Sequence, residues 1–128
     1  MNNAEAGASG AADDVPHAIG LVRVSDGYLT GDIHWIDPVG VGAVIGAVAT
    51  GTADISDVEE DVSAEHASVG WDAGCSRWLL RDLGSTNGTR LVSGANGEEK
   101  VLDSGGAAEL YPGDEITLGA STTFVVMA

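Results

Sequence analysis

The feature that most constrains this chain is a succession of short apolar or alternating runs, each closed by Gly, Asp, Asn or Pro. From Ile19 onward the runs recur about every ten residues, and no segment has the length and periodicity of an amphipathic helix. This spacing predicts an all-β fold, an antiparallel sandwich or barrel. The runs are IGLVRV (19–24), GDIHWID (31–37), VGAVIGAV (41–48), HASVGWD (66–72), RWLLRDL (77–83), TRLV (89–92), AAELY (107–111), EITLG (115–119) and TTFVVM (122–127).

Several connections between the runs contain residues suited to tight turns. Asn87-Gly88 predicts a two-residue hairpin, because both residues accept a positive φ. Ser25-Asp26-Gly27 follows the first run, and Pro112-Gly113-Asp114 predicts a turn with proline second and glycine third. Ser93 to Gly106 predicts a long, mobile polar loop. The apolar run from Val39 to Ala49 is too short to span a bilayer, and we interpret it as a buried strand.

Charge and cysteine content narrow the class of protein. The formal net charge of -15, with only five Lys and Arg residues, opposes binding to nucleic acid or to an anionic membrane surface. Residues 1–17 are small, polar and acidic, so we expect a disordered tail or linker before a domain at 18–128. This segment lacks the features of a signal peptide, and Cys75 has no internal disulfide partner, so we expect a cytoplasmic location. The tail and the acidity suggest a piece of a bacterial multi-domain protein.

Patterns of catalytic and metal-binding residues are missing from the sequence. There is no phosphate-loop lysine motif, HExxH, paired CxxC or Gly-x-Ser-x-Gly elbow. His17 lies in the tail, His34 alternates with apolar neighbours as a strand residue does, and Cys75 lies in an expected turn. An acidic cluster comprises Asp54, Asp57, Glu59, Glu60, Asp61 and Glu65. Its spacing does not match an EF-hand, and we interpret it as a solvated loop. We therefore expect no enzyme activity, no metal and no cofactor.

Two further stretches, DVSAEHASV (61–69) and LGSTNGT (83–89), are weak signals alone but form a far more specific motif when they occur in this order. With IGA (45–47), ADIS (53–56) and GDEITLG (113–119), they give the sequence a motif order that resembles the forkhead-associated (FHA) domain family. The resemblance extends from Ile19 to the C-terminus, about 110 of the 128 residues. It implies a β-sandwich of about eleven mostly antiparallel strands that binds phosphothreonine peptides through loops at one end.

The resemblance also implies roles for individual residues. Ser63 would donate its hydroxyl to a phosphate oxygen. Ser85 and Thr86 would lie on the loop that surrounds the phosphothreonine, with Thr86 as the main phosphate contact. Asn87 would hydrogen-bond the peptide backbone. The resemblance assigns loop architecture, rather than ligand contact, to Gly46, His66 and Gly88.

Two positions depart from the family pattern. Ala47 and Ala64 stand where the family places cations that bind the phosphate. Each charge-assisted hydrogen bond contributes about 1.5–3 kcal/mol, so losing both predicts roughly two to four powers of ten weaker phosphate binding. Arg90 follows the NGT motif and could approach the binding end, whereas the other basic residues stand at no matching position. These are Arg23, Arg77, Arg81 and Lys100.

Two functions stay open on this evidence. The first is an FHA-type peptide-recognition domain with weakened or lost phosphate dependence, which binds a protein or phosphothreonine peptide in serine/threonine-kinase signalling. The second is a structural or oligomerisation scaffold without phosphopeptide binding. Asn87, Ser63 and His66 do not distinguish the two, because each also suits loop packing.

Overall fold

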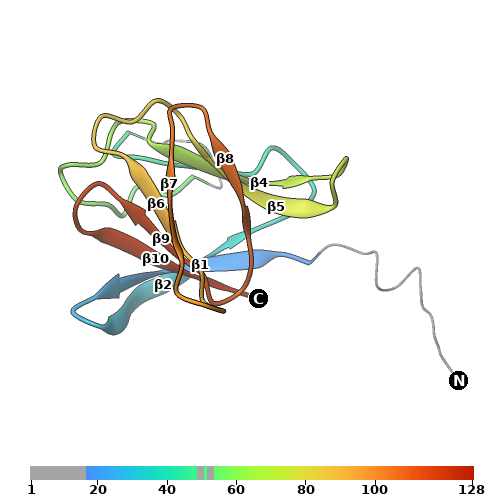
Figure 1. Cartoon of the computed structure of the whole chain (residues 1–128), viewed down its shortest axis with the longest axis horizontal. Coiled ribbons are helices and arrows are strands. Elements are labelled where there is room, and N and C mark those ends of the chain that lie inside the picture. The colour runs from blue at the N-terminus through green and yellow to red at the C-terminus, as the bar shows by residue number, and fades with distance from the viewer. Residues whose placement is uncertain (1–16, 49–50, 52–53) are drawn as a thin grey trace, which may run out of the picture.

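The computed structural model describes residues 17–48, 51 and 54–128, which form ten strands and no helix able to cross a membrane (Figure 1). The strands are β1 (Ile19–Ser25), β2 (Tyr28–Ile36), β3 (Ala43–Ile45), β4 (Ala67–Asp72), β5 (Arg77–Asp82), β6 (Thr89–Val92), β7 (Glu99–Leu102), β8 (Ala107–Leu110), β9 (Glu115–Leu118) and β10 (Thr122–Met127). An isolated parallel bridge joins Ile45 to Ile55. Residues 1–16 of the expected tail, with 49, 50, 52 and 53, lie outside the described residues.

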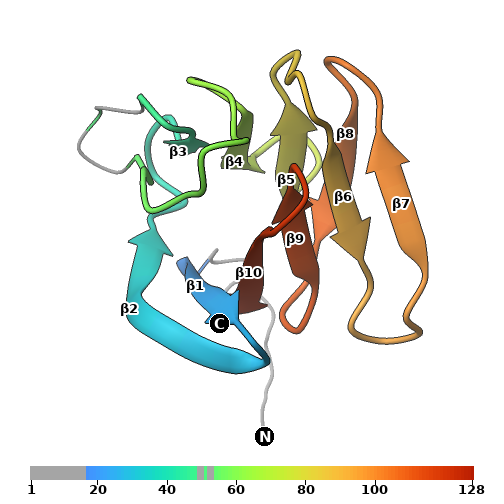
Figure 2. The same cartoon turned by 90° about the vertical axis from the view of Figure 1, so that its left-hand side faces the viewer.

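The strands form two antiparallel sheets. The six-stranded sheet has the order β2-β1-β10-β9-β6-β7, and the four-stranded sheet has the order β3-β4-β5-β8. Figure 2 shows β2 and β7 at opposite margins of the larger sheet. This arrangement confirms the predicted all-β sandwich.

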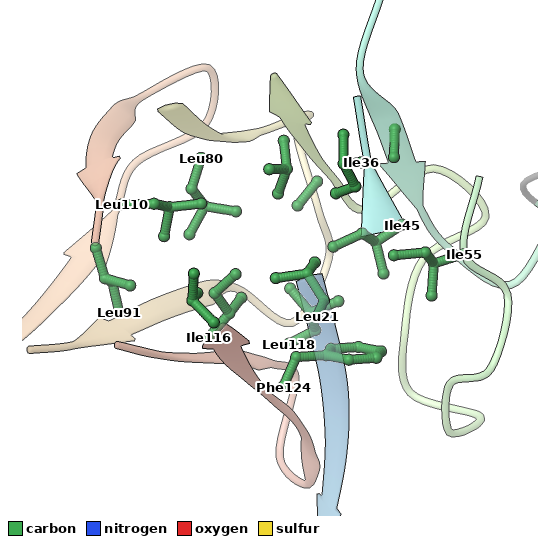
Figure 3. Packing of buried hydrophobic residues seen from close by; sticks show 14 of the residues in the cluster. Leu21, Ile36, Ile45, Ile55, Leu80, Leu91, Leu110, Ile116, Leu118 and Phe124 are labelled. Carbon is green, nitrogen blue, oxygen red and sulfur yellow. The ribbon is translucent and has the colours of Figure 1, made fainter. Parts of the chain in front are cut away.

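The core lies between the two sheets. Buried and less buried residues alternate in β6 and β10, as the period of two in a strand requires. Leu21, Ile116 and Phe124 of the larger sheet meet Ile45 and Leu80 of the smaller one (Figure 3). All five side chains are almost fully inaccessible to water. The apolar positions of the predicted runs therefore account for the packing of the sandwich.

The predicted buried strand from Val39 to Ala49 is wrong over most of its length. Only Ala43–Ile45 is a strand, while Val39, Val41 and Val48 are exposed and Ala49 lies outside the described residues. Gly40 and Gly42 have φ of 133° and 82°, which interrupts any extended backbone. Composition suggested burial, but the glycines break the run into a turn followed by a short strand.

Two other connections differ from their predictions. The expected polar loop from Ser93 to Gly106 contains β7, which pairs with β6 from Thr89↔Leu102 to Val92↔Glu99. The expected hairpin at Asn87-Gly88 is a crossing between sheets, because β5 belongs to the smaller sheet and β6 to the larger. Only Gly88 has a positive φ there, at 90°. This crossing brings the motif to one end of the sandwich.

Two predicted turns are confirmed. Asp26 and Gly27 have φ of 53° and 82° and connect the paired residues Ser25 and Tyr28. Gly113 has φ of 95°, and the Asp114 amide donates to the Tyr111 carbonyl at 3.1 Å. Proline and glycine therefore occupy the second and third positions that the sequence predicted.

Candidate functional site

Two connections meet at one end of the sandwich. The first joins β3 to β4 and carries Asp61 and Ser63; the second joins β5 to β6 and carries Thr86 and Asn87. The Thr86 amide donates to Ser63 Oγ at 3.0 Å, and Asn87 Nδ2 donates to the Asp61 carbonyl oxygen at 2.7 Å. Both connections lie along the upper side of the molecule in Figure 2. We call this end, with Ala47 and Ala64, the recognition tip.

The two alanines flank Ser63 in space. The Ala47 amide donates to the Ser63 carbonyl at 3.0 Å, and the Val48 amide donates to the Ala64 carbonyl at 3.1 Å. Both alanine side chains are exposed. A Cβ at Gly46 would lie 2.1 Å from the Ala64 carbonyl oxygen, so only glycine allows this approach of the two backbones. The structure therefore brings positions 47 and 64 to the same surface as Ser63.

His66 connects the two loops from within. Its side chain is fully buried, and Nδ1 accepts a hydrogen bond from the Ser63 amide at 3.0 Å. Because Nδ1 is an acceptor, Nε2 carries the proton and donates to the Gly88 carbonyl at 2.7 Å. That carbonyl also accepts from the Gly119 amide at 3.0 Å, so the β9–β10 turn is held at the same point. The imidazole thus fixes the spacing of the loops and has no free nitrogen for catalysis.

Asp82 organises the second loop. Oδ2 accepts from the amides of Gly84 and Ser85 at 2.9 and 3.1 Å, and Oδ1 accepts from the hydroxyls of Ser85 and Thr89, both at 2.6 Å. The Ser85 hydroxyl in turn accepts from the Gly88 amide at 3.1 Å. Ser85 is therefore engaged inside its own loop, which leaves Thr86 and Asn87 at the surface.

The pKa of Asp82 reflects two opposing effects. The residue is only 2% exposed, and burial alone would raise the pKa of its carboxyl. The hydrogen bonds from the side chains of Ser85 and Thr89, and from the amides of Ser85 and Gly84, outweigh burial and lower that pKa. The carboxylate is thus charged at neutral pH and holds the loop. Sequence reasoning assigned Asp82 no role. An Asp side chain that accepts hydrogen bonds from the backbone amides two and three residues later is nevertheless a known turn signal.

The recognition tip offers neutral hydrogen-bonding groups. Ser63 Oγ accepts from the Thr86 amide, and its own hydroxyl proton has no acceptor among the described residues. The Thr86 hydroxyl likewise has no partner in the part of the chain that the structure describes, and Thr86 and Asn87 are exposed. The tip can therefore donate two hydroxyl hydrogen bonds and exchange amide hydrogen bonds through Asn87, with no formal positive charge.

Acidic residues dominate the charge around the tip. Segments 46–66 and 83–88 contain six Asp and Glu residues and no Lys or Arg. Among the described residues the buried Lys or Arg side chain is Arg23 of β1, which is 8% exposed. Its Nη1 donates to the Asp57 carbonyl at 2.7 Å and the Asp57 carboxylate at 3.2 Å, and its Nη2 donates to Glu59 at 3.1 Å. Arg23 therefore neutralises part of the acidic loop and is not directed at a ligand.

The acidic loop is more than the solvated segment that the sequence predicted. The Asp54 carboxylate accepts from the amides of Val44 and Gly51, and Asp61 Oδ2 accepts from the Ala120 amide at 2.6 Å. The carboxylates of Asp57 and Glu59 remain about half exposed. Sequence reasoning also missed the buried position of Arg23, although the alternation of Ile19 and Leu21 places it on the inward face of β1.

The remaining candidates lie elsewhere. His34 packs edge-on to Phe124 with ring centroids 6.3 Å apart, which agrees with the predicted strand role. Cys75 is exposed in the β4–β5 turn. Arg90 pairs with Glu99 at 3.2 Å across β6 and β7, rather than with a group of the tip. Arg77 pairs with Glu109 on the smaller sheet, and this hydrogen bond lowers the pKa of Glu109.

Comparisons with known proteins agree with this geometry. The FHA domain family model matches residues 44–119, more than half of the chain. Protein phosphatase 2C 70 of Arabidopsis thaliana is 36% identical over 77 residues, 58% of this chain, and the chain spans only 13% of that protein's length. The solved FHA domain of an Arabidopsis thaliana hypothetical protein is 29% identical, with a TM-score of 0.67, and the match covers 86% of this chain and 84% of that one. The N-terminal FHA domain of Saccharomyces cerevisiae Rad53p, solved with a phosphothreonine peptide, is 18% identical, with a TM-score of 0.64 over 87% and 93% of the two chains.

Proposed function

The chain belongs to the FHA domain family, and from this premise we propose that it is a protein-interaction domain whose recognition tip has weakened or lost phosphate dependence. FHA domains are generally interaction modules rather than enzymes, and the tip offers no nucleophile paired with a base. The ligand would be an extended segment of a partner protein. A protein or peptide in serine/threonine-kinase signalling is the partner that family membership suggests.

The observation that carries this proposal is the contrast between the loop framework and its charge. The Thr86 amide is bonded to Ser63 Oγ at 3.0 Å and Asn87 Nδ2 to the Asp61 carbonyl at 2.7 Å, whereas Ala47 and Ala64 present only methyl groups. A phosphothreonine carries nearly two negative charges and three strong acceptors. Neutral hydroxyl donors contribute about 0.5–1.5 kcal/mol each, against about 1.5–3 kcal/mol for charged donors. The tip is therefore suited to a hydroxyl or amide group better than to a dianion.

The acidic residues around the tip would also disfavour the binding of a phosphate. Glu60 and Glu65 are exposed on the first loop, and Asp61 lies within it against Asn87. A phosphate at Ser63 would approach these carboxylates without a cation between them. Repulsion of this kind is strongest at low salt, because added ions screen it.

A specific observation favours the second candidate, a scaffold without phosphopeptide binding. Ser63 Oγ and Asn87 Nδ2 already form hydrogen bonds inside the protein, so both residues have a structural role without a ligand. Under this alternative, the tip residues stabilise the loops and partners bind elsewhere. The two candidates differ in whether substitution of Thr86, which has an unengaged hydroxyl, affects binding of any peptide.

The test is a gain of function. Phosphothreonine peptides and their unphosphorylated twins are titrated by fluorescence anisotropy against the full chain and against the double variant Ala47→Arg/Ala64→Arg. We expect little discrimination by the natural chain and about 10²–10⁴-fold tighter binding of phosphorylated peptides by the variant. The matched control is Ala73→Arg/Ala95→Arg, which adds the same charge at two exposed turn positions outside the tip and should change little.

Tight binding by the natural chain that is lost on dephosphorylation would contradict the proposed weakening. No binding by the double variant, if it is folded, would favour the scaffold candidate. Thr86→Ala in the double variant separates the two further, because it weakens binding only if the tip contacts the peptide.

A further inference from the structure

The outer face of the six-stranded sheet has an apolar half and a polar half. Gly20 pairs with Trp35 and Met127, Val22 with Val125, and Val24 with Leu29, so these residues share the face turned away from the core. Ile33 joins them, since a Cβ at Gly20 would lie 2.4 Å from its Cγ2 atom. We call this half the outer apolar face: Val22, Val24, Leu29, Ile33, Trp35, Val125 and Met127.

The other half of the same face is polar. On β9, β6 and β7 the corresponding positions include Glu115, Thr117, Arg90 and Glu99, and Arg90 and Glu99 form an ion pair. The division follows strand order, from β2 at one margin to β7 at the other. Half of one sheet face thus departs from the polar exterior that an antiparallel sheet usually presents to water.

Large side chains are unusually exposed along and after β2. Tyr28, Leu29 and Trp35 are 75%, 59% and 54% exposed. Val39 and Val41 in the following turn are more exposed still, and Asp37, Val39, Gly40, Val41, Gly42, Val44, Gly51 and Asp54 line a shallow hollow there. Of the ten large hydrophobic side chains exposed among the described residues, six lie between positions 28 and 41. Clustering of this kind marks an interaction surface rather than scattered surface residues.

The outer edge of β2, which lies beside this surface, is available to pair with a further strand. Within the described residues β2 pairs only with β1, and its other edge has no partner strand. It is nine residues long, with a break in its extended backbone at Gly31, where φ is 79°, whereas the other edge strands β3, β7 and β8 have three or four residues. A long free edge with apolar side chains is a template for an added strand. The register shift between Leu21 and Arg23 leaves His34–Ile36, with Trp35 at its centre, in regular pairing with Ile19–Leu21.

The charge of the residues in and around β2 indicates the composition of a strand that would bind beside it. No Lys or Arg occurs between Val24 and Ser76, and Asp32 lies within β2 while Asp26 and Asp37 lie in the connections before and after it. A second copy of this chain would bring another net charge of -15 and its own Asp32 to the same edge. Apolar side chains alternating with Lys or Arg would match both the apolar face and the acidic residues of β2 and its connections.

We propose that the free edge of β2 and the outer apolar face bind an extended basic segment of a partner protein, which adds as a strand next to β2 with apolar residues on Trp35 and Ile33. This surface is separate from the recognition tip. The inference does not depend on whether the tip binds phosphate.

The probe is a short synthetic peptide in which valine alternates with lysine, together with its glutamate twin. Binding to the full chain is followed by the chemical shifts of the backbone amides and of the Trp35 indole N–H. We expect the lysine peptide to shift β2 amides and Trp35→Ala to weaken it at least about tenfold, as loss of an aromatic anchor does. Tyr111→Ala is the matched control: Tyr111 is 57% exposed, lies between β8 and β9 and is not part of the outer apolar face, so its replacement should leave affinity unchanged. Asp32→Lys should reverse the preference between the two peptides.

Four outcomes would overturn the proposal. They are equal binding of the glutamate twin, shifts confined to Ser63 and Asn87, a dimer at high concentration that Trp35→Ala abolishes, and binding that appears only when residues 1–16 are removed. The third would assign the surface to a second copy, and the fourth to the chain's own N-terminal segment. Because Trp35 is exposed, its replacement should leave the fold intact, which circular dichroism checks.

Discussion

Replacing Asp82 by alanine should remove a large part of the stability of this domain. The change deletes the acceptor of four hydrogen bonds, two from amides and two from hydroxyls, at a residue that is 2% exposed. A buried donor left without an acceptor costs about 1–3 kcal/mol, but the hydroxyls can rotate and the exposed Gly84 amide can reach water. We therefore expect a loss of about 3–5 kcal/mol, at least about a fifth of a typical stability of about 5–15 kcal/mol.

Asp82→Asn isolates the contribution of the charge. The amide oxygen still accepts from the Gly84 and Ser85 amides, so we expect a loss of only about 1–2 kcal/mol at neutral pH. Because folding lowers the pKa of Asp82, the unfolded chain takes up its proton first as pH falls. The stabilisation is complete above about pH 5 and is lost as pH falls through about 3.9, the unfolded pKa, towards the lower folded pKa. The gap between the natural chain and Asp82→Asn should therefore close in acid.

Urea unfolding between pH 7 and pH 3, followed by tryptophan fluorescence, measures both effects. Asp103→Asn is the control, because its exposed side chain forms no hydrogen bond among the described residues, and it should change stability by less than about 0.5 kcal/mol. A gap between natural chain and Asp82→Asn that stays constant or widens down to pH 3 would refute the assignment of the stabilisation to the charged carboxylate.

Three further substitutions test the framework around the tip. His66→Phe keeps the ring but removes both hydrogen bonds to the loops, so we expect a loss of about 2–4 kcal/mol in urea unfolding, and an unchanged stability would contradict the bridging role. Gly46→Ala should clearly lower the melting temperature, because its Cβ would lie 2.1 Å from the Ala64 carbonyl oxygen. Gly70→Ala is the control and should not, since its Cβ would have ordinary contacts at 3.8 Å. Equal effects of the two substitutions would exclude the close backbone approach at Gly46 as the cause. Arg23→Ala removes the cation beside Asp57 and Glu59. The Glu59 amide donates to Thr122 Oγ1 at 3.0 Å, and its hydrogen exchange should become faster in this variant. Unaltered exchange would show that Arg23 does not hold the loop.

The sequence predicted strands better than connections, for a physical reason. TRLV and TTFVVM appear as β6 and β10 with their predicted bounds, because alternating side chains report directly on burial. The Asn87-Gly88 connection was wrong because the local turn preference does not reveal that its two strands belong to different sheets. The hidden strand Glu99–Leu102 was missed because its side chains are mostly exposed and charged, and its pairing with β6 depends on long-range contacts.

The candidate site was also predicted only in part from the sequence. The resemblance grouped Ser63, Thr86 and Asn87, and in the structure two hydrogen bonds join the loops that carry them, from the Thr86 amide to Ser63 and from Asn87 to the Asp61 carbonyl. The partners that position them could not be read from spacing alone. Asp61 contributes a backbone carbonyl, which has no sequence signature, and Asp82 acts through a carboxylate buried only in the folded state.

The scaffold and the charge of the recognition tip are physically independent. Asp82, His66 and Gly46 are required by buried hydrogen bonds and by a close backbone approach, whether or not a ligand binds. Positions 47 and 64, in contrast, hold the loops only through backbone groups, and their side chains are exposed. Alanine or arginine at these two positions should therefore give domains of nearly equal stability, within about 0.5 kcal/mol, but very different affinity for a phosphate.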